Sequence, residues 1–305
     1  MRIFTIGETT FDILFRGGNP VGACSGGSAF NSAISLGRCG LPVNLISTFG
    51  NDHIGDLSMA FLTSNGVNCG LIKRFEGQSR IALAFFDSDN NANYSFYQAS
   101  KDVSPDYPVP QKNDLILLGS SFALRDNGRN QLLGFLRQAK HAGCIIIYDP
   151  NARQPLSEKP GIVNKILENI ALATIVKGSD QDFDNIFKLK DSKSVYARIS
   201  ESKNKYLVYT RGVKGAEIIT PDFGLAVKAN ETNVISTIGA GDNFSAGIIF
   251  GLFNKLVNNL LIEELTLPDW EKIMDYGILF SSEVCGSSEN YLTKETGVRL
   301  RNVHC

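Results

Sequence analysis

The segment Val234-Ile-Ser-Thr-Ile-Gly-Ala-Gly-Asp-Asn-Phe-Ser-Ala-Gly247 joins a glycine-rich turn to an apolar pattern. Apolar residues recur at helical spacing from Phe244 to Phe253, which predicts a helix directly after the turn. Glycines let backbone amides approach an anion closely, and the first turn of a helix has unpaired N–H groups and a partial positive charge. Gly239, Ala240 and Gly241 therefore predict a phosphate site.

Asp242 ends this turn, and a carboxylate would repel a phosphate there. A fixed carboxylate beside a phosphate site has a use if it takes a proton from an attacking hydroxyl group. The alternative is an N-cap residue, because aspartate is common at that position after a glycine-rich turn. These residues alone leave both interpretations open.

The bulk composition is close to average, with 305 residues of which 43% are hydrophobic and 20% charged. This length suits one large α/β domain or two smaller ones. The net charge of −1 gives no reason to expect nucleic acid or an acidic membrane surface as a partner. Six cysteines without a C-x-x-C pair and only three histidines predict neither a zinc site nor a disulfide framework.

The N-terminal residues run straight into an apolar strand pattern at Ile3–Ile6, without the basic start of a signal peptide. No apolar run approaches the roughly 20 residues of a membrane span. We therefore expect a soluble, cytoplasmic protein with reduced thiols.

Short apolar runs alternate with helical patterns along the chain. The expected buried strands are 43–49, 115–118, 144–148, 173–176 and 207–210, and the expected helices are about 28–39, 56–64, 130–142 and 165–171. Strands that are apolar throughout are typical of a parallel sheet covered on both faces. The βαβα order predicts a doubly wound, mainly parallel α/β sheet in a single domain over 1–305.

Two segments, about 10–23 and 79–100, depart from this alternation. The first is strand-like and glycine-rich, and the second contains a hairpin signal around a polar turn. We expect them to form a small sheet that acts as a lid, because phosphoryl transfer must exclude water; the alternative is an ordinary edge hairpin. Apolar side chains at Phe85, Phe86 and Phe96 allow two lids to pack into a homodimer.

Two polar groups near the N-terminus are candidate ligands for a polyol. Gly26 and Gly27 precede the first long helix and permit a close backbone approach, and Asn31 offers a donor and acceptors. The alternative is a simple loop with an asparagine facing water. Asp12 lies just past the first strand, where it could hold two hydroxyl groups or could face solvent.

Further polar residues follow three other expected strands. Asp149-Pro-Asn151-Ala-Arg153 ends an apolar strand, and Arg153 could bind a phosphate or a carboxylate; a turn that merely ends the strand is the alternative. In Lys177-Gly-Ser179-Asp-Gln-Asp182, Ser179 and Asp182 could form a capping box, and Asp182 could also reach Mg²⁺ through water. A further turn is Thr210-Arg-Gly212-Val-Lys-Gly215. It either only connects two strands or binds nucleotide phosphates through its amides and the Thr210 hydroxyl.

Three common fingerprints are missing. The chain has neither the P-loop pattern nor the G-x-G-x-x-G pattern, and it has no G-x-S-x-G elbow. This disfavours a P-loop enzyme, a Rossmann dehydrogenase and an α/β-hydrolase.

Taken in order, these motifs resemble the ribokinase-like (PfkB) family of carbohydrate kinases over almost the whole chain. The matching pieces are Ile6-Gly-Glu8 with Asp12, Gly26-Gly27 with Asn31, Gly50-Asn-Asp52 with Gly55, Asp149-Pro-Asn151 with Arg153, Lys177-Gly-Ser179, Thr210-Arg-Gly212 with Gly215-Ala216, and Gly239-Ala-Gly-Asp242. Each piece alone is weak evidence for this family, but the complete set in this order is specific for it. The Gly-Glu start, the Asp-Pro-Asn-x-Arg run and Phe96-Tyr97 are most similar to the fructokinase branch.

The resemblance implies ATP-dependent phosphorylation of the primary hydroxyl of a free sugar, most simply D-fructose. It implies that Asp242 is the general base and that the amides of Gly239, Ala240, Gly241 and Asp242 form an anion hole. The implied sugar contacts are Asp12, Gly26, Gly27, Asn31 and Arg153. The implied ATP contacts are Lys177, Ser179, Thr210, Gly212 and Gly215, with Asp182 placing Mg²⁺ indirectly.

The chain departs from the family pattern at three places. Ser236 stands where the family usually has an aspartate that helps to bind a monovalent cation, so activation by K⁺ is in doubt. Asp182 replaces a usual glutamate and shortens the carboxylate. The segment 281–290 lacks the usual small apolar run. Alternative functions are a kinase for 2-keto-3-deoxygluconate, ribose or a nucleoside, and a catalytically inactive sugar-binding or regulatory protein.

Overall fold

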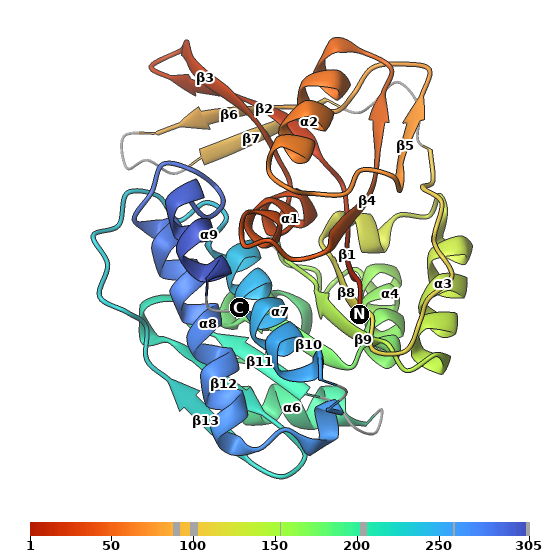
Figure 1. The fold of residues 1–305 in the computed structure, drawn as a ribbon, viewed down its shortest axis with the longest axis vertical. Coiled ribbons are helices and arrows are strands. Elements are labelled where there is room, and N and C mark those ends of the chain that lie inside the picture. Colours follow the sequence, from red (N-terminus) through yellow and green to blue (C-terminus); the bar gives the residue numbers. More distant parts are fainter. Residues whose placement is uncertain (88–91, 98–102, 153, 202–205, 259, 303–305) are drawn as a thin grey trace.

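The computed structural model describes residues 1–87, 92–97, 103–152, 154–201, 206–258 and 260–302. Two β-sheets and the helices around them make up the fold (Figure 1). The strands are β1 (Ile3–Ile6), β2 (Thr10–Arg16), β3 (Asn19–Gly26), β4 (Val43–Gly50), β5 (Ile72–Phe75), β6 (Ile81–Phe86), β7 (Ala92–Tyr97), β8 (Leu115–Gly119), β9 (Ile145–Asp149), β10 (Ile175–Ser179), β11 (Tyr206–Thr210), β12 (Ala216–Ile219) and β13 (Gly224–Val227). The α-helices are α1 (Ser28–Arg38), α2 (His53–Ser64), α3 (Arg129–His141), α4 (Pro160–Leu172), α5 (Asp180–Phe187), α6 (Ser192–Ser200), α7 (Ala240–Leu256), α8 (Leu267–Cys285) and α9 (Lys294–Arg301).

The large sheet has nine strands in the order β13-β12-β11-β10-β9-β8-β1-β4-β5. The strands from β11 to β5 in this order pair in parallel. The pairs β11–β12 and β12–β13 are antiparallel. Parallel strands need crossover connections, which the intervening helices supply. The doubly wound, mainly parallel sheet predicted from the sequence is therefore confirmed.

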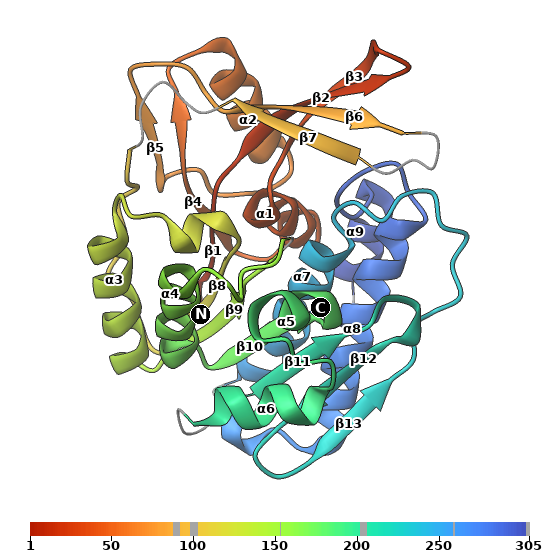
Figure 2. The same ribbon diagram turned by 180° about the vertical axis from the view of Figure 1, so that it is seen from behind.

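Each central strand sends alternate side chains into two separate cores. Leu115 and Leu117 of β8 pack with α1, α7 and α8, whereas Ile116 and Leu118 pack with α3 and α4. Figure 1 shows α1, α7 and α8 in front of the sheet, and Figure 2 shows α4, α5 and α6 on the other face. Burial on both faces is why these strands read as continuous apolar runs.

Helix α7 packs unusually close to α8, because it carries glycines on the facing side. A Cβ atom on Gly247 would overlap the backbone of Tyr276, and one on Gly251 would lie 2.9 Å from the Cα atom of Ile273. The close approach fixes α7 against the sheet. The helix begins directly after Gly239, in the glycine-rich turn.

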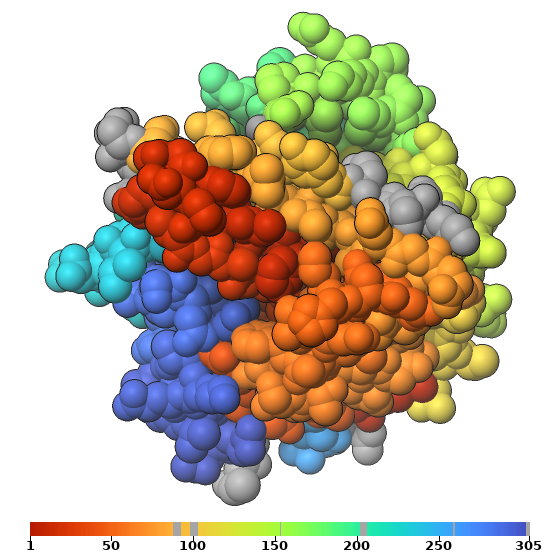
Figure 3. All heavy atoms as spheres, turned by 90° about the horizontal axis from the view of Figure 1, so that it is seen from above, coloured from red at the N-terminus to blue at the C-terminus, as the bar shows by residue number. Residues whose placement is uncertain are grey.

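The small sheet has the order β3-β2-β6-β7 and joins the large sheet through the short link between β1 and β2. The segment expected to be one strand is a hairpin, with Gly17 and Gly18 at positive φ in its turn. Figure 3, a view from above, shows this N-terminal part of the chain (red) beside the C-terminal part (blue). The sheet expected at 10–23 and 79–100 is thus confirmed for the described residues, and 88–91 and 98–100 lie outside them.

The three phenylalanines predicted for one apolar lid face lie on two faces. The strand register pairs Asp12 with Ala82 and Ala82 with Phe96, so these three side chains share a face. Phe86 shares this face by alternation along β6, and Phe85 lies on the opposite face, where it stacks on Phe15. Period-two alternation, which the prediction did not apply, explains the error.

Some elements were not foreseen. Helix α4 begins at Pro160, about one turn before the expected start, because proline fits the first turn of a helix. The short strands β5 and β13 lie at the two edges of the large sheet, and α8 and α9 close the chain. Within the described residues, no helix is both long and apolar enough to cross a membrane.

Candidate active site

The glycine-rich turn before α7 is held in one conformation by its neighbours. Gly239 is the N-cap with φ of 80°, and a Cβ atom there would overlap the carbonyl oxygen of Asn290. The Asn243 side chain donates from Nδ2 to the carbonyl oxygens of Gly239, at 2.7 Å, and Asn290, at 2.8 Å. The Ser35 hydroxyl of α1 in turn contacts Asn243 Oδ1. These contacts therefore fix the turn and, with it, the positions of the backbone amides in the first turn of α7.

Asp242 is buried in this turn, with 7% of its surface exposed. Its Oδ2 atom accepts a hydrogen bond from Asn31 Nδ2 of α1 at 2.9 Å, and its main-chain oxygen accepts one from Ser32 Oγ at 2.8 Å. Gly239 is the N-cap of α7, and the Asp242 side chain caps no backbone N–H group of that helix. The N-cap interpretation of Asp242 is therefore wrong, because a neighbouring helix and not its own helix holds the carboxylate.

Asn31 is also buried, at 4% exposed, so the alternative of an asparagine facing water is wrong. Its Oδ1 atom has no hydrogen-bond partner among the described residues. Gly27, the residue before α1, has φ of 119°, and a Cβ atom there would overlap the carbonyl oxygen of Glu8. Only glycine lets the chain pass this close to the end of β1, which brings Asn31 against Asp242.

Asp12 on β2 is buried, so it does not face solvent. Its Oδ1 atom accepts a hydrogen bond from Thr10 Oγ1 at 2.6 Å. A Cβ atom on Gly26 would lie 3.1 Å from Oδ2, so this glycine leaves room for the carboxylate. Burial, with the charge of Asp12 as a smaller cause, raises the pKa of the neighbouring Cys24 thiol to about 11 and keeps it protonated.

Asp149 and Lys177 form a buried ion pair at the ends of β9 and β10. Lys177 Nζ lies 2.8 Å from Asp149 Oδ2 and donates at 3.2 Å to the carbonyl oxygen of Gly241. Burial by itself lowers the pKa of Lys177, but the Asp149 carboxylate outweighs it, so the pKa lies above its usual value and the ammonium stays charged. Asp149 Oδ1 also accepts from the amide of Asn151, at 3.3 Å.

Ser179 and Asp182 form the capping box predicted for α5. Ser179 accepts from the Asp182 amide at 3.1 Å, and Asp182 Oδ2 accepts from the Ser179 amide at 2.7 Å. Asp182 Oδ1 accepts from the amide of Ala152 at 2.7 Å, which ties the loop after β9 to this helix. Arg153, the predicted sugar contact in that loop, lies outside the described residues.

The turn after β11 runs beside the start of α5. Thr210 pairs with Ser179 in the parallel register of β10 and β11, which brings these two predicted nucleotide contacts together. Gly212 is exposed in a 3₁₀ turn with φ of 53°. Gly215 has φ of 85°, and a Cβ atom there would overlap the carbonyl oxygen of Val227, so the turn needs glycine for packing as well.

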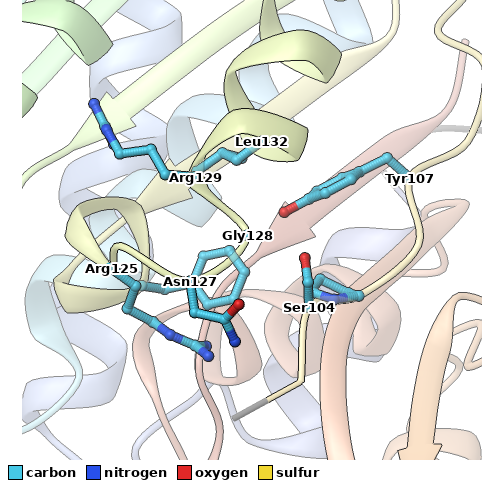
Figure 4. A pocket seen from close by; sticks show the side chains of 9 residues that line it. Ser104, Tyr107, Arg125, Asn127, Gly128, Arg129 and Leu132 are labelled. Atoms are coloured by element: carbon cyan, nitrogen blue, oxygen red, sulfur yellow. The ribbon is translucent and has the colours of Figure 1, made fainter.

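Two hollows lie apart from these residues. One of about 10 Å³ is lined by Ser104, Tyr107 and Arg125 at the start of α3 (Figure 4), and it has room for about one water molecule. The other is an open groove of about 420 Å³ between the segment 105–109 and α3. No predicted site residue lines either hollow. Within the described part of the chain, no cluster of His, Cys, Asp and Glu could hold a metal ion by itself.

Comparison with known proteins decides the family. The model of the pfkB family of carbohydrate kinases matches residues 19–289. The chain is a pfkB family carbohydrate kinase. It is 29% identical over 273 residues to a probable chloroplastic fructokinase-6 of Arabidopsis thaliana, a match that covers 86% of this chain and 68% of that relative. It is 28% identical over 262 residues to a fructokinase of Rhizobium leguminosarum bv. trifolii, covering 82% of this chain and 79% of the relative.

Two solved structures share the fold of this kinase. Aminoimidazole riboside kinase from Salmonella enterica, in complex with aminoimidazole riboside and an ATP analogue, superposes with a TM-score of 0.84 at 21% identity and covers 100% of both chains. Fructokinase from Vibrio cholerae, with fructose, ADP and calcium bound, superposes with a TM-score of 0.82 at 20% identity and covers 98% of each.

The contacts that brace the site were not predicted from the sequence. Ser32, Ser35 and Asn243 tie α1 to α7, and Asp149 holds Lys177 beneath the turn. One signal could have revealed the last pair. Lys177 is a charged residue inside an apolar strand, and such a residue needs a buried partner of opposite charge on a neighbouring strand.

Proposed function

We propose that this sugar kinase transfers the γ-phosphoryl group of ATP to the primary hydroxyl of a free sugar, with D-fructose as the leading acceptor. The buried Asp242 carboxylate in the first turn of α7 carries the proposal. Relatives named as fructokinases in plants and bacteria support the choice of sugar. ATP as the donor is supported by a solved structural neighbour that holds an ATP analogue.

In this proposal Asp242 takes the proton of the sugar hydroxyl as that oxygen forms its bond to the γ-phosphorus. The bond from this phosphorus to the bridging oxygen breaks, and ADP leaves with the electron pair. Asn31 donates to Asp242 Oδ2 and leaves Oδ1 for the substrate. The backbone amides of Gly239, Gly241 and Asp242 would stabilise the moving phosphoryl group at the positive end of α7. The Ala240 amide donates to the Thr237 carbonyl oxygen at 3.3 Å, so its part in the anion hole stays a prediction.

The sugar would lie between the lid and α1. Asp12, a buried carboxylate, suits a pair of sugar hydroxyls, and the Asn31 Oδ1 atom without a partner suits a third. Gly26 and Gly27 would let the sugar approach the backbone, and Arg153 stays a predicted contact. Phe96 lies on the same lid face as Asp12 with 60% of its surface exposed, so it would cover an apolar face of the sugar.

The nucleotide would lie over the adjacent ends of β10 and β11. Ser179 and Thr210 are neighbours there, and the exposed Gly212 would offer its backbone amide to the phosphates. The buried Gly215 donates its amide to the Gly212 carbonyl oxygen at 3.0 Å, so its predicted contact with ATP stays a prediction. The predicted contact of Lys177 with ATP stays a prediction, because its Nζ atom already donates to Asp149 and Gly241.

Magnesium would be held mainly by the phosphates of the nucleotide, with Asp182 contributing through water. Asp182 Oδ1 accepts one backbone hydrogen bond, and a carboxylate oxygen can accept a second from such a water molecule. A monovalent cation does not fit as well at Ser236, whose Oγ atom accepts from the Ile238 amide at 3.2 Å and which carries no charge. We therefore expect little response to K⁺.

A coupled ADP-release assay over a panel of acceptors tests the choice of sugar. The panel contains D-fructose, other hexoses, 2-keto-3-deoxygluconate, ribose and nucleosides. We expect the highest kcat/KM with D-fructose. A higher value with the keto acid, ribose or a nucleoside would replace fructose, and the riboside bound by the Salmonella neighbour keeps the last two in the panel. Sugar binding without ADP release under any condition would favour the inactive sugar-binding protein.

We also propose that two lids form a homodimer through the face opposite Asp12. The stacked rings of Phe15 and Phe85 lie on this face with Tyr97, which is 58% exposed. An apolar face that is self-complementary suits a two-fold interface. Light scattering should give twice the mass of the chain, and a monomeric mass at micromolar concentration would refute the dimer.

A further inference from the structure

The pair formed by Lys177 and Asp149 is the most deeply buried ion pair near the proposed phosphoryl-transfer site. Both residues are 4% exposed, and their strands, β10 and β9, are neighbours in the large sheet. Each charged group is engaged by its neighbours, Asp149 Oδ2 by Lys177 and Ser245, and Lys177 Nζ by Asp149 and the Gly241 carbonyl oxygen. Their function must therefore pass through the groups that they contact.

Those contacts lead to the glycine-rich turn. Lys177 Nζ donates to the carbonyl oxygen of Gly241 at 3.2 Å. Ser245 Oγ lies 3.2 Å from the same carbonyl oxygen and 3.2 Å from Asp149 Oδ2, so it bridges the turn and the ion pair. A Cβ atom on Gly241 would lie 3.3 Å from Lys177 Nζ. The ammonium group thus lies directly beneath the turn.

Stability alone is a poor reason for such a pair. Removing two charges from water costs several kcal/mol per ion, and well-packed apolar residues of similar volume often serve as well or better. A buried charge that is paired, hydrogen-bonded and pointed at one carbonyl group has a geometric use instead. It fixes the position of that carbonyl group, and its field acts through a region from which water is excluded.

We propose that Lys177 and Asp149 are a positioning pair for phosphoryl transfer. Lys177 holds the Gly241 carbonyl group, Asp149 holds Lys177, and Ser245 contacts both Asp149 and that carbonyl group, so that the amides of the turn and the Asp242 carboxylate keep their places during the reaction. This inference rests on the proposed function of the turn. The pair acts on the transition state and not on the affinity for sugar or ATP.

The test removes both charges together, because removing one alone would leave an unpaired buried charge and could unfold the protein. The double variant Lys177→Met/Asp149→Asn is compared with the wild type and with Arg2→Met/Asp114→Asn. The control pair has its carboxylate buried on the large sheet as well, with the ion pair at 2.6 Å, and it contacts no predicted site residue. All variants are assayed with the sugar that the wild type phosphorylates fastest.

We expect the double variant to keep KM for sugar and ATP within about threefold and to lose about 100-fold in kcat, the scale of a small misplacement of reacting groups. Its affinity for ADP with tetrafluoroaluminate and sugar, which mimic the transition state, should fall by a similar factor. The control should keep its kcat. A kcat within threefold of wild type in the double variant would overturn the proposal.

Two further variants allow the proposal to be tested even if the double variant does not fold. If the double variant does not fold, Ser245→Ala decides, since it removes the bridge without a charge; a kcat about fivefold lower at unchanged KM supports the pair, and an unchanged kcat refutes it. Asp242→Asn separates the two proposals. An active Asp242→Asn variant would refute the function assigned to the turn, whereas an inactive one beside an active double variant would refute the positioning pair alone.

Discussion

At the scale of single residues, the site depends on a few side chains from distant parts of the sequence. Asp242 is held by Asn31, which stands 211 positions earlier in the chain, and Lys177 is held by Asp149 on another strand. The motifs indicated candidate site residues, because glycine-rich turns and polar strand ends are visible in the sequence. They did not predict the partners, because a pairing across two helices or two strands leaves no periodic signal.

Gly239→Ala should damage both stability and activity. The substitution places a Cβ atom at positive φ against the carbonyl oxygen of Asn290, and a strained residue of this kind costs about 1–3 kcal/mol. We expect a lower free energy of unfolding by denaturant and a reduced kcat, because the turn must shift. Gly134→Ala in α3 is the matched control, since nothing lies within 4 Å of its Cβ position; it should stabilise by up to about 1 kcal/mol. Equal effects of the two changes would contradict the account.

At the scale of elements, the alternation of β6 and β7 divides the small sheet into two faces, to which we assign different functions. Phe96 and Tyr97 are adjacent and almost equally exposed, but they point to opposite faces. The hairpin signal predicted that these strands exist. Which side chain faces the sugar followed only from the pairing with β2, because sequence alternation alone does not say which face is covered.

Phe96→Ala should raise KM for the sugar about tenfold, which corresponds to roughly 1.4 kcal/mol, because the ring would no longer cover the bound sugar. Tyr97→Ala, its neighbour on the outer face, should change KM by less than about threefold and should weaken the dimer. Steady-state kinetics and light scattering on both variants check this. The lid assignment fails if Tyr97→Ala raises KM as much as Phe96→Ala.

The first turn of α8 gives a pH-dependent contribution to stability. Asp269 forms a capping box with Thr266 and lies 2.6 Å from Lys255 of α7. The hydrogen bonds from Lys255 and then Thr266 lower the pKa of Asp269 from 3.8 to about 2. A lowered pKa in the folded state means that this stabilisation is present above pH 4 and is lost as the pH falls from about 4 to about 2.

Asp269→Asn should therefore be less stable than the wild type at pH 6, and the gap should shrink as the pH falls through this window. Denaturant unfolding at several pH values measures it. A gap that stays constant down to pH 2 would show that the carboxylate charge contributes nothing.

At the scale of the whole molecule, the parallel sheet and the order of its elements were predictable because both faces are buried. Continuous apolar runs such as 144–148 mark such strands clearly. The edge strands β5 and β13 were not predictable, since each has only four residues and β5 has charged residues among the apolar ones. Helices α8 and α9 follow the last motif, so nothing in the motif order indicated them.

The organisation as one domain with a lid, over residues 1–305, stays a prediction. Because short links join β1 to β2 and β5 to β6, we expect the lid strands to unfold together with the large sheet. Calorimetry should show one transition, and sugar with a nucleotide analogue should raise its midpoint. Two separable transitions, of which only one responds to ligand, would indicate two independent domains.

The central claim is that Asp242 takes the proton from the sugar hydroxyl, and single-turnover kinetics of Asp242→Asn test it most directly. The variant keeps the shape of the side chain and its neighbour Asn31, so sugar and ATP should bind almost as in the wild type. We predict that the rate of phosphoryl transfer falls by about 10²–10⁴-fold, the usual range for a lost general base, while Asp269→Asn, far from the turn, keeps its rate. A transfer rate close to that of the wild type in Asp242→Asn would contradict the account.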